Sequence, residues 1–205
     1  MIGNLWPFRR PLSLEISSLF ARFLDLTHIA NAQWRLLGKA KAPFSVRLHG
    51  RVHVSGRGQL VLGEGVSFAG TVVPVELATY DHGRIEIGEH TFINYGSSIA
   101  ARTSVKIGSR CLLGHYTFIM DSNQHDIAKR NKLGPVAPVI IEDDVWIGAK
   151  AVILSGVRIG AHAVIGAGSI VTNDIPPLCV AAGNPARVLR FLTKFEEAES
   201  GSDAG

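Results

Sequence analysis

The chain has 205 residues, of which 46% are hydrophobic and 19% are charged, a composition that suits one globular domain and excludes an intrinsically disordered protein. Its formal net charge of +4 favours anionic partners such as nucleotide phosphates or anionic lipid headgroups, without choosing among them. The two cysteines lie far apart in the sequence, which excludes a disulfide framework and a CxxC metal site, so a reducing compartment fits best.

Residues 1–45 are predicted to form an amino-terminal helical segment. Over residues 12–38 apolar residues recur at helical spacing; they are Leu12, Ile16, Phe20, Phe23, Ala30, Trp34 and Leu37. We expect this helix to pack on the following domain or to cap its open end, because an uncapped repeat domain exposes apolar surface and strand edges. The arginines and lysines of residues 9–41 suit another role, which is peripheral contact with an anionic membrane surface.

Charged residues bear on export and membrane insertion. Glu15, Arg22 and Asp25 interrupt the first apolar stretch, and no small-residue cleavage site follows it. A secretory signal and a membrane-spanning helix are therefore not expected. We expect a cytoplasmic protein, in which any peripheral membrane contact would be made at the inner membrane face.

Aliphatic residues recur at every sixth position. One block is Ile141, Ile147, Ile153, Ile159, Ile165 and Val171, and an earlier block with a two-residue slip is Ile87, Ile93, Ile99, Ile107, Leu113 and Ile119. Small or β-branched residues stand four positions after each member of the later block; they are Val145, Ala151, Val157, Ala163, Ser169 and Ile175. This period matches neither an amphipathic helix nor an alternating strand, and it predicts a solenoid over residues 46–178.

Such a period has a simple geometric interpretation. Three hexapeptides would make one 18-residue turn of a triangular coil, with the aliphatic and the small residue both pointing inward. Coils would stack like strands of a parallel sheet, ~4.8 Å apart, so Ile141, Ile159 and, nearly, Pro177 would form one interior column. Glycines that directly follow the aliphatic residue are expected to permit the backbone angles of tight corners; they are Gly148, Gly160 and Gly166. A β-sandwich with chance spacing is the alternative, which the unbroken frame disfavours.

The hexapeptide frame disappears over residues 120–138, which are polar and basic. A solenoid expels such an insertion as an external loop, and loops on rigid scaffolds often carry functional groups. His125 lies in this segment, and an imidazole can take a proton near neutral pH. Asp121 and Asp126 are both close enough in sequence to fix its tautomer and support its charge. A solvated surface histidine is the alternative for His125.

Four segments resemble, in order, the hexapeptide-repeat acyltransferases, in particular the sugar O-acetyltransferases that include galactoside, maltose and polysaccharide-modifying acetyltransferases. They are residues 145–150, 165–169, 174–177 and 182–190. The resemblance covers residues 85–190, about half of the chain. It implies an all-β fold, the left-handed parallel β-helix of hexapeptide repeats, and a homotrimer with each site between two subunits. Residues 179–205 would form a carboxy-terminal extension that ends in an acidic, disordered tail.

The resemblance also implies an O-acetyltransferase that moves the acetyl group of acetyl-CoA to a hydroxyl of a sugar or glycan acceptor. His125 would be the general base for direct attack, with Asp121 or Asp126 supporting it, and the Ala149 N–H would meet the oxyanion. Asn94 and His115 would bind the acceptor. The residues implied for the cofactor are Trp146, Gly148, Ala149, Lys150, Gly166, Ala167, Asn173, Arg187 and Arg190, of which the two arginines would hold CoA phosphates.

Two departures limit what can be transferred. Asn173 stands where family members commonly have a lysine that contacts phosphate. Galactoside acetyltransferase has acidic residues in the strand after its acceptor asparagine, whereas this chain has Ala100, Ala101 and Arg102, so the identity of the acceptor does not transfer.

Several other functions are open at this point. Another acyl-CoA donor or an amino-sugar acceptor would suit the same residues. A γ-class carbonic anhydrase needs three zinc-binding histidines, and the spacing of His90, His115 and His125 does not resemble that arrangement, so no metal is expected. A non-catalytic β-helix would have no reason to keep His125 beside the 182–190 segment. We expect no nucleic-acid partner.

Overall fold

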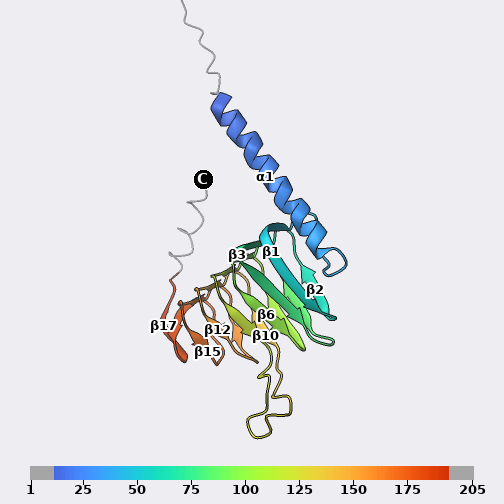
Figure 1. Ribbon diagram of the computed structural model, residues 1–205. Helices are drawn as coiled ribbons and strands as arrows, with labels where there is room; N and C mark the ends of the chain where they lie inside the picture. Colours follow the sequence, from blue (N-terminus) through green and yellow to red (C-terminus); the bar gives the residue numbers. More distant parts are fainter. Residues whose placement is uncertain (1–11, 194–205) are drawn as a thin grey trace, which may run out of the picture.

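The computed structural model describes residues 12–193, which form one long helix followed by a solenoid of short strands (Figure 1). The helix α1 spans Leu12–Leu36. The strands that follow are β1 (Arg47–Gly56), β2 (Gln59–Leu62), β3 (Ser67–Thr79), β4 (Arg84–Ile87), β5 (Phe92–Ile93), β6 (Ser98–Ala101), β7 (Ser104–Ile107), β8 (Leu112–Leu113), β9 (Phe118–Met120), β10 (Val139–Ile141), β11 (Trp146–Ile147), β12 (Val152–Ile153), β13 (Arg158–Ile159), β14 (Val164–Ile165), β15 (Ile170–Val171), β16 (Cys179–Gly183) and β17 (Ala186–Phe191).

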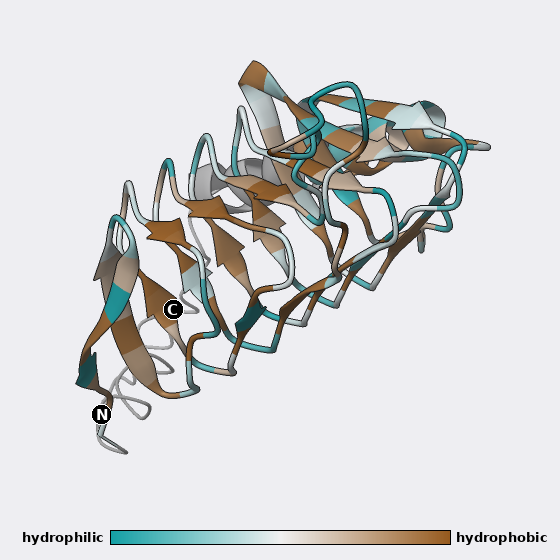
Figure 2. Cartoon of the chain, turned by 90° about the horizontal axis from the view of Figure 1, so that it is seen from below, coloured by the Kyte–Doolittle hydropathy of each residue, from teal (hydrophilic) through white to brown (hydrophobic). Residues whose placement is uncertain are grey.

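The strands stack into three parallel ladders, which are the faces of a triangular coil (Figure 2). The first face is β2, β4, β7, β10 and β13. The second face starts with the first half of β3 and continues through β5, β8, β11, β14 and β16. The third face starts with the second half of β3 and continues through β6, β9, β12 and β15. The predicted parallel β-helix is therefore confirmed.

The register of the ladders follows the hexapeptide frame. Ile141 pairs with Ile159, 18 positions further on, as expected. Ile87 pairs with Ile107, 20 positions further on, which accounts for the slip in the frame. Inward positions are filled by the aliphatic residues and by the small residues four positions later, and all of the latter are buried.

The last interior column ends differently from the prediction. Ile159 bridges to Ile175 rather than to Pro177, so the final coil is two residues shorter than the others. Pro177 instead lies against the Gly160 backbone. The second-face ladder also continues past the predicted end at residue 178, because β16 pairs with β14 and β17 then folds back antiparallel on β16. The predicted disordered tail lies outside the described residues.

The glycines of the repeat have a different role from the expected one. A Cβ on Gly148 would lie 2.5 Å from the Ala167 nitrogen, and one on Gly160 would lie 2.4 Å from the Pro177 nitrogen. Neither glycine has a positive φ; that conformation falls two positions later in the repeat, as at Lys150, whose φ is 59°. These glycines are needed because successive coils approach too closely for a side chain.

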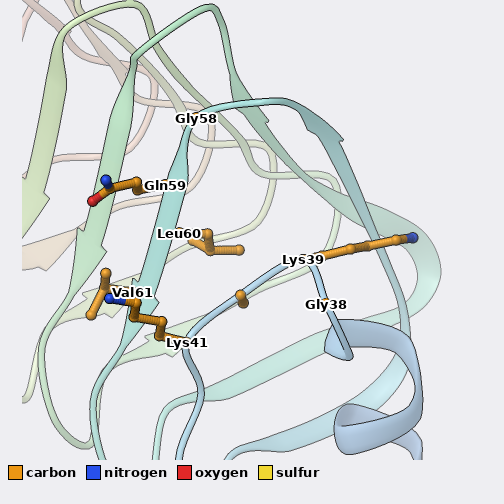
Figure 3. Close-up of a pocket in the computed structure, with 8 residues that line it drawn as sticks. Gly38, Lys39, Lys41, Gly58, Gln59, Leu60 and Val61 are labelled. Carbon is orange, nitrogen blue, oxygen red and sulfur yellow. The ribbon is translucent and has the colours of Figure 1, made fainter.

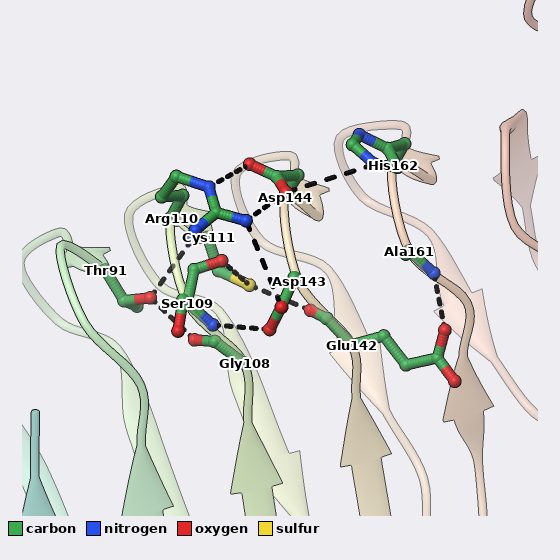
Figure 4. Close-up of polar contacts among 10 residues, drawn as sticks. All are labelled: Thr91, Gly108, Ser109, Arg110, Cys111, Glu142, Asp143, Asp144, Ala161 and His162. Atoms are coloured by element: carbon green, nitrogen blue, oxygen red, sulfur yellow. Dashed lines mark hydrogen bonds and ion pairs between the residues drawn. The ribbon is translucent and has the colours of Figure 1, made fainter.

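Carboxylates join successive coils at the corner between the first and second faces (Figure 4). Arg110 donates two 2.7 Å hydrogen bonds to Asp144, and this guanidinium holds the pKa of the Asp144 carboxyl below its ordinary value. Asp143 accepts from the Ser109 N–H at 2.8 Å. Because these groups are largely exposed, each ion pair adds little stability, but the carboxylate satisfies a backbone N–H at the corner.

The carboxy-terminal half of α1 covers the open end of the coil, as predicted for a cap. Ala32 and Leu36 are buried, and the Asn31 side-chain amide donates to the carbonyl oxygens of Leu48 and Gly50, both at 2.9 Å. Asp25 forms an ion pair with Arg47. The helix therefore satisfies polar backbone groups of β1 as well as covering apolar ones.

The predicted apolar stripe of α1 is wrong at its carboxy-terminal end. Trp34 and Leu37 are 82% and 78% exposed, whereas Ala32 and Leu36 face the coil. The helix packs on β1, which presents polar as well as apolar groups, so the face in contact is less apolar than the predicted stripe. No helix within residues 12–193 is both long and apolar enough to span a bilayer, and contact of residues 9–41 with a membrane surface stays a prediction.

Residues 121–138 leave the coil after β9 and return to β10, which forms the external loop that the sequence predicted (Figure 1). A bridge between Ser122 and Val136 closes its base. Asp121 is fully buried there, and its carboxylate accepts backbone N–H bonds of 2.7–2.8 Å from residues 102 and 103, in the turn between β6 and β7, and from residue 104, the first of β7. Asp121 thus fixes both the turn of the preceding coil and the start of the loop.

Gly88→Ala tests the close approach of the coils. A Cβ at this position would lie 2.5 Å from the backbone carbon of Gly108, so we expect a loss of about 2–3 kcal/mol in the free energy of unfolding, measured with urea. Gly168→Asn is the control, because φ there is +70° and a Cβ would have no atom within 4 Å; it should cost less than about 1 kcal/mol. Equal losses in the two variants would contradict the stacking explanation.

Asp121→Asn removes the charge and half of the acceptor capacity from a buried group that serves three N–H donors. We expect a loss of about 3 kcal/mol in the free energy of unfolding, because hydrogen bonds to charged groups are strong and a buried donor is left unsatisfied. Asp126→Asn, in the external loop, should change it by less than about 1 kcal/mol. Unchanged stability in Asp121→Asn would mean that this carboxylate does not organise the base of the loop.

Candidate functional site

The predicted site residues fall on two edges of the coil. Edge A is the corner between the second and third faces, and it consists of residues 94–97, 114–117, 148–151 and 166–169. Backbone hydrogen bonds of 2.8–3.0 Å join successive corners. The N–H groups of Tyr116, Lys150 and Gly168 donate to the carbonyl oxygens of Tyr95, His115 and Ala149, respectively. Edge B is the corner between the third and first faces, and it consists of residues 80–83, 102–103, 121–138, 154–157 and 172–174.

Edge A carries both predicted acceptor residues within an aromatic cluster. Asn94 accepts from the Tyr95 N–H at 2.9 Å. The Tyr95 ring stacks on His115, with centroids 5.2 Å apart and an interplanar angle of 12°, and Tyr116 meets both rings edge-on. The sequence analysis missed the two tyrosines, although the 20-residue register of these coils places Tyr95 directly beside His115.

Further along edge A lie most of the predicted cofactor residues; they are Gly148, Ala149, Lys150, Gly166 and Ala167. A Cβ on Gly166 would lie 2.7 Å from the Ala182 Cβ, and Ala182 pairs with Arg187 on β17. Arg187 therefore ends the same line of residues. Trp146 lies on the second face, beside this line of residues, and is 55% exposed. It pairs with Val164, which pairs with Val180, and Val180 pairs in turn with Arg190.

Asn173 does not join this group. It lies on edge B, where its side-chain oxygen accepts from the Thr172 hydroxyl at 2.8 Å. On one chain, a whole face of the coil separates it from Gly166 and Ala167. Any contact of Asn173 with the same ligand would have to be made across a subunit interface.

His125 lies on the loop of edge B, which projects away from the coil (Figure 1). Its Nδ1 atom is 2.9 Å from the Arg130 carbonyl oxygen. A carbonyl oxygen can only accept, so Nδ1 carries the proton and Nε2 keeps the lone pair. His125, Asp126, Ile127 and Arg130 line a hollow of about 470 Å³. The ring is thus held in the tautomer that a base acting through Nε2 requires.

Neither acid predicted to support His125 is hydrogen-bonded to it in the described residues. Asp126 accepts from the N–H groups of Ala128 and Lys129, at 2.9 and 2.7 Å. Asp121 is occupied by the three backbone N–H groups of the turn before β7. The group that orients the ring is a backbone carbonyl, which has no signature in the sequence.

A hollow at the amino-terminal end of the first face is not a candidate site (Figure 3). It has a volume of about 270 Å³ and lies between the segment after α1 and β2. The Lys39 side chain points away from it, while Gln59 and Lys41 do not converge on a common point. Such a hollow lacks the grouped polar atoms that orient a ligand.

Thiol and metal chemistry gain no support from the described residues. Cys111 is fully buried, and burial raises the pKa of its thiol to about 11, so it is not a nucleophile near neutral pH. No three His, Cys, Asp or Glu side chains within residues 12–193 are placed to share a metal ion. His90, His115 and His125 lie on three different edges of the coil and cannot meet on one chain.

Residues 138–173 match the family described as bacterial transferase hexapeptide (six repeats). Galactoside O-acetyltransferase of Escherichia coli (strain K12) is 40% identical over 111 residues, which are 53% of this chain and 54% of that enzyme. An N-acetyltransferase of Staphylococcus aureus, acting on 2,3,4,5-tetrahydropyridine-2,6-dicarboxylate, is 54% identical over 61 residues, or 30% of this chain and 26% of that enzyme. The chain thus spans about half the length of the galactoside enzyme, and less of the other.

Solved structures agree with these likenesses. A hexapeptide-repeat acetyltransferase from Vibrio cholerae is 31% identical and covers 71% of this chain and 75% of its own, with a TM-score of 0.51. Its complex with acetyl coenzyme A aligns over 94% and 95% of the two chains, at 25% identity and a TM-score of 0.54. Galactoside acetyltransferase in complex with coenzyme A is 33% identical, covers 71% and 67%, and has a TM-score of 0.53. With the six-residue frame and the three-faced coil, they show that this chain belongs to the hexapeptide-repeat acyltransferases, the family of the left-handed parallel β-helix.

Proposed function

We propose that this protein is an O-acetyltransferase that uses acetyl-CoA to acetylate a hydroxyl of a sugar or glycan. The observation that carries the proposal is the His125 ring, whose Nδ1 is held by the Arg130 carbonyl so that Nε2 can take a proton. The likeness to galactoside O-acetyltransferase, and to an acetyltransferase solved with acetyl coenzyme A, supports the donor and the kind of acceptor.

The proposed reaction is a direct transfer. His125 Nε2 takes the proton of the acceptor hydroxyl while the oxygen attacks the thioester carbonyl. The tetrahedral intermediate carries a negative oxygen, which a backbone N–H near Ala149 would stabilise. Its collapse breaks the carbon–sulfur bond, and the imidazolium returns the proton to the departing thiolate. No residue forms an acyl-enzyme in this scheme, which agrees with the burial of Cys111.

Edge A offers a track for a long donor molecule. Gly148, Ala149, Gly166 and Ala167 place small residues along the corner, and the partly exposed Trp146 would form an apolar wall beside it. Arg187 is exposed at the end of the track, where a guanidinium can make charge-assisted bonds to phosphate. The described residues therefore suit the pantetheine arm along the edge and the nucleotide phosphates at its carboxy-terminal end.

We further propose a homotrimer in which each site is shared between two chains. On one chain, His125 projects from edge B while Asn94 and Ala149 lie on edge A, with the third face between them. The outward row of the second face is apolar and partly exposed; its members are Phe92, Leu112, Trp146, Val164 and Val180. Packing this row against a neighbouring coil would bring edge A of one chain to the loop of another, and three-fold closure leaves no open contact.

Transfer to an amine is the second candidate. The S. aureus relative is an N-acetyltransferase and shares 54% identity over 61 residues. An amino-sugar acceptor would need the same base and donor track. Comparing matched sugars that carry a hydroxyl or an amine at one carbon distinguishes the two reactions, and matched acyl-CoA donors test the acyl group.

His125→Ala should lower the rate of thiol release from acetyl-CoA, in the presence of a sugar acceptor, by ~10²–10⁴-fold. Thermal stability should be nearly unchanged, because the loop lies outside the core. His162→Ala, an exposed histidine at the corner between the first and second faces, is the matched control and should keep normal activity. Near-normal turnover in His125→Ala would remove this residue from the mechanism and direct attention to His115.

Mixed assemblies test the shared site. His125→Ala and Trp146→Ala chains, each expected to be inactive alone, should recover roughly a quarter of wild-type activity after co-refolding, because random mixing joins an intact loop to an intact donor track at that fraction of interfaces. Native mass spectrometry would verify that mixed trimers had formed. Mixed trimers without recovered activity, or an active monomer in light scattering, would show that one chain carries the whole site.

A further inference from the structure

An arginine on edge B has no adequate partner. Arg102 follows β6, and its backbone N–H binds Asp121 at the base of the His125 loop, 2.8 Å away. Its Nε atom is buried and has no hydrogen-bond partner within residues 12–193. Its only ion pair in the described residues is a 3.9 Å contact with Asp81, whose side chain is 82% exposed. A contact of that length to a solvated carboxylate holds the guanidinium weakly.

The guanidinium is nevertheless held in place. Its central carbon lies 4.6 Å from the centroid of the Tyr80 ring, which stacks beneath it as a cation–π contact. Tyr80 itself is fixed by its N–H, which donates to the Ala101 carbonyl at 2.8 Å. The Arg102 side chain is 24% exposed, so part of its fork reaches solvent. A positioned fork with unused donors is the arrangement that recognises a planar or tetrahedral anion.

A second unpaired polar group in the described residues belongs to the residue that follows Asp121. Ser122 is 6% exposed, and its hydroxyl has no hydrogen-bond partner in the part of the chain that the structure describes. Buried polar groups without partners are uncommon in folded proteins, and each calls for an explanation such as a bound water, ion or ligand. The exposed side of the loop adds positive charge through Lys129, Arg130 and Lys132. The region around the proposed base is therefore electropositive and carries two unused hydrogen-bonding groups.

We infer that Arg102, aided by Ser122, binds an anionic group of the acceptor, so that the preferred acceptor is an acidic sugar bearing a carboxylate or a phosphate. This inference rests on the proposed acetyl transfer. Arg102 and the loop that carries His125 are joined through Asp121, so an anion bound at Arg102 would be held near the base. Arg102 would act in specificity, and it would not take part in the chemical step.

The test compares matched acceptors in the acetyl-CoA thiol-release assay with the full chain: glucose, glucuronate and glucose 6-phosphate. Wild type should favour an acidic sugar over glucose, and the acidic sugar that reacts faster tells carboxylate from phosphate. Arg102→Gln should lower kcat/KM for the acidic sugar by ~10–100-fold and change that for glucose by less than about 3-fold. Arg102→Lys, which keeps the charge but loses the fork, should fall between them. Arg51→Gln, at an exposed arginine of β1, is the control and should change neither.

Calorimetric binding of glucuronate and glucose 6-phosphate separates this inference from the proposed function. Binding to wild type that is lost in Arg102→Gln, without any thiol release, would retain the anion site and overturn the transfer reaction. Transfer that proceeds equally with glucose and both acidic sugars, and that Arg102→Gln lowers equally for all three, would overturn the anion site alone. Failure of both acidic sugars to bind wild type would also overturn the anion site. The melting temperature of Arg102→Gln should stay close to that of wild type, since the variant loses the cation–π contact with Tyr80 but also removes a buried unpaired Nε.

Discussion

The close stacking of the coils is the constraint on which the rest of the structure depends. Parallel strands lie ~4.8 Å apart, and at each corner this brings one backbone against the next, so that a Cβ at Gly148 would lie 2.5 Å from the Ala167 nitrogen. Every corner must therefore repeat the same short sequence pattern, with glycine at the contact and small residues inside. The six-residue period is the trace that this packing leaves in the sequence.

A coil packed in this way has no interior space for chemistry. Its inward positions are filled by branched side chains and small residues, and its faces are flat ladders. Functional groups must project from the corners, which is where the predicted site residues lie, with Asn94 and His115 on edge A and His125 on the loop of edge B. Because a single convex coil cannot enclose a donor as long as CoA, a second coil alongside would be needed to complete a groove.

The six-residue period predicts most of the fold, but several features lie beyond it. The frame predicts the coil, the slip and the external loop, since these depend on side-chain size at regular positions. It could not reveal the Arg130 carbonyl that orients His125, because a backbone group has no side-chain signature. The helix face was mispredicted because Asn31 binds carbonyl oxygens of β1, which depends on what the helix packs against. The contact between Tyr95 and His115 can be predicted from the sequence if the 20-residue register is extended to outward-facing positions.

Fold and chemistry meet at the base of the loop. A general base on an external loop can be positioned only if the start of that loop is fixed relative to the coil. Asp121 fixes it by accepting three backbone N–H bonds from residues 102, 103 and 104. The same carboxylate thereby sets the position of Arg102 against Tyr80. A fully bonded Asp121 beside an unpaired Arg102 Nε and Ser122 hydroxyl is an uneven distribution of hydrogen bonds within one small region. Stability alone would favour pairing all of these groups, and the anion proposed to bind at Arg102 would supply a partner for them.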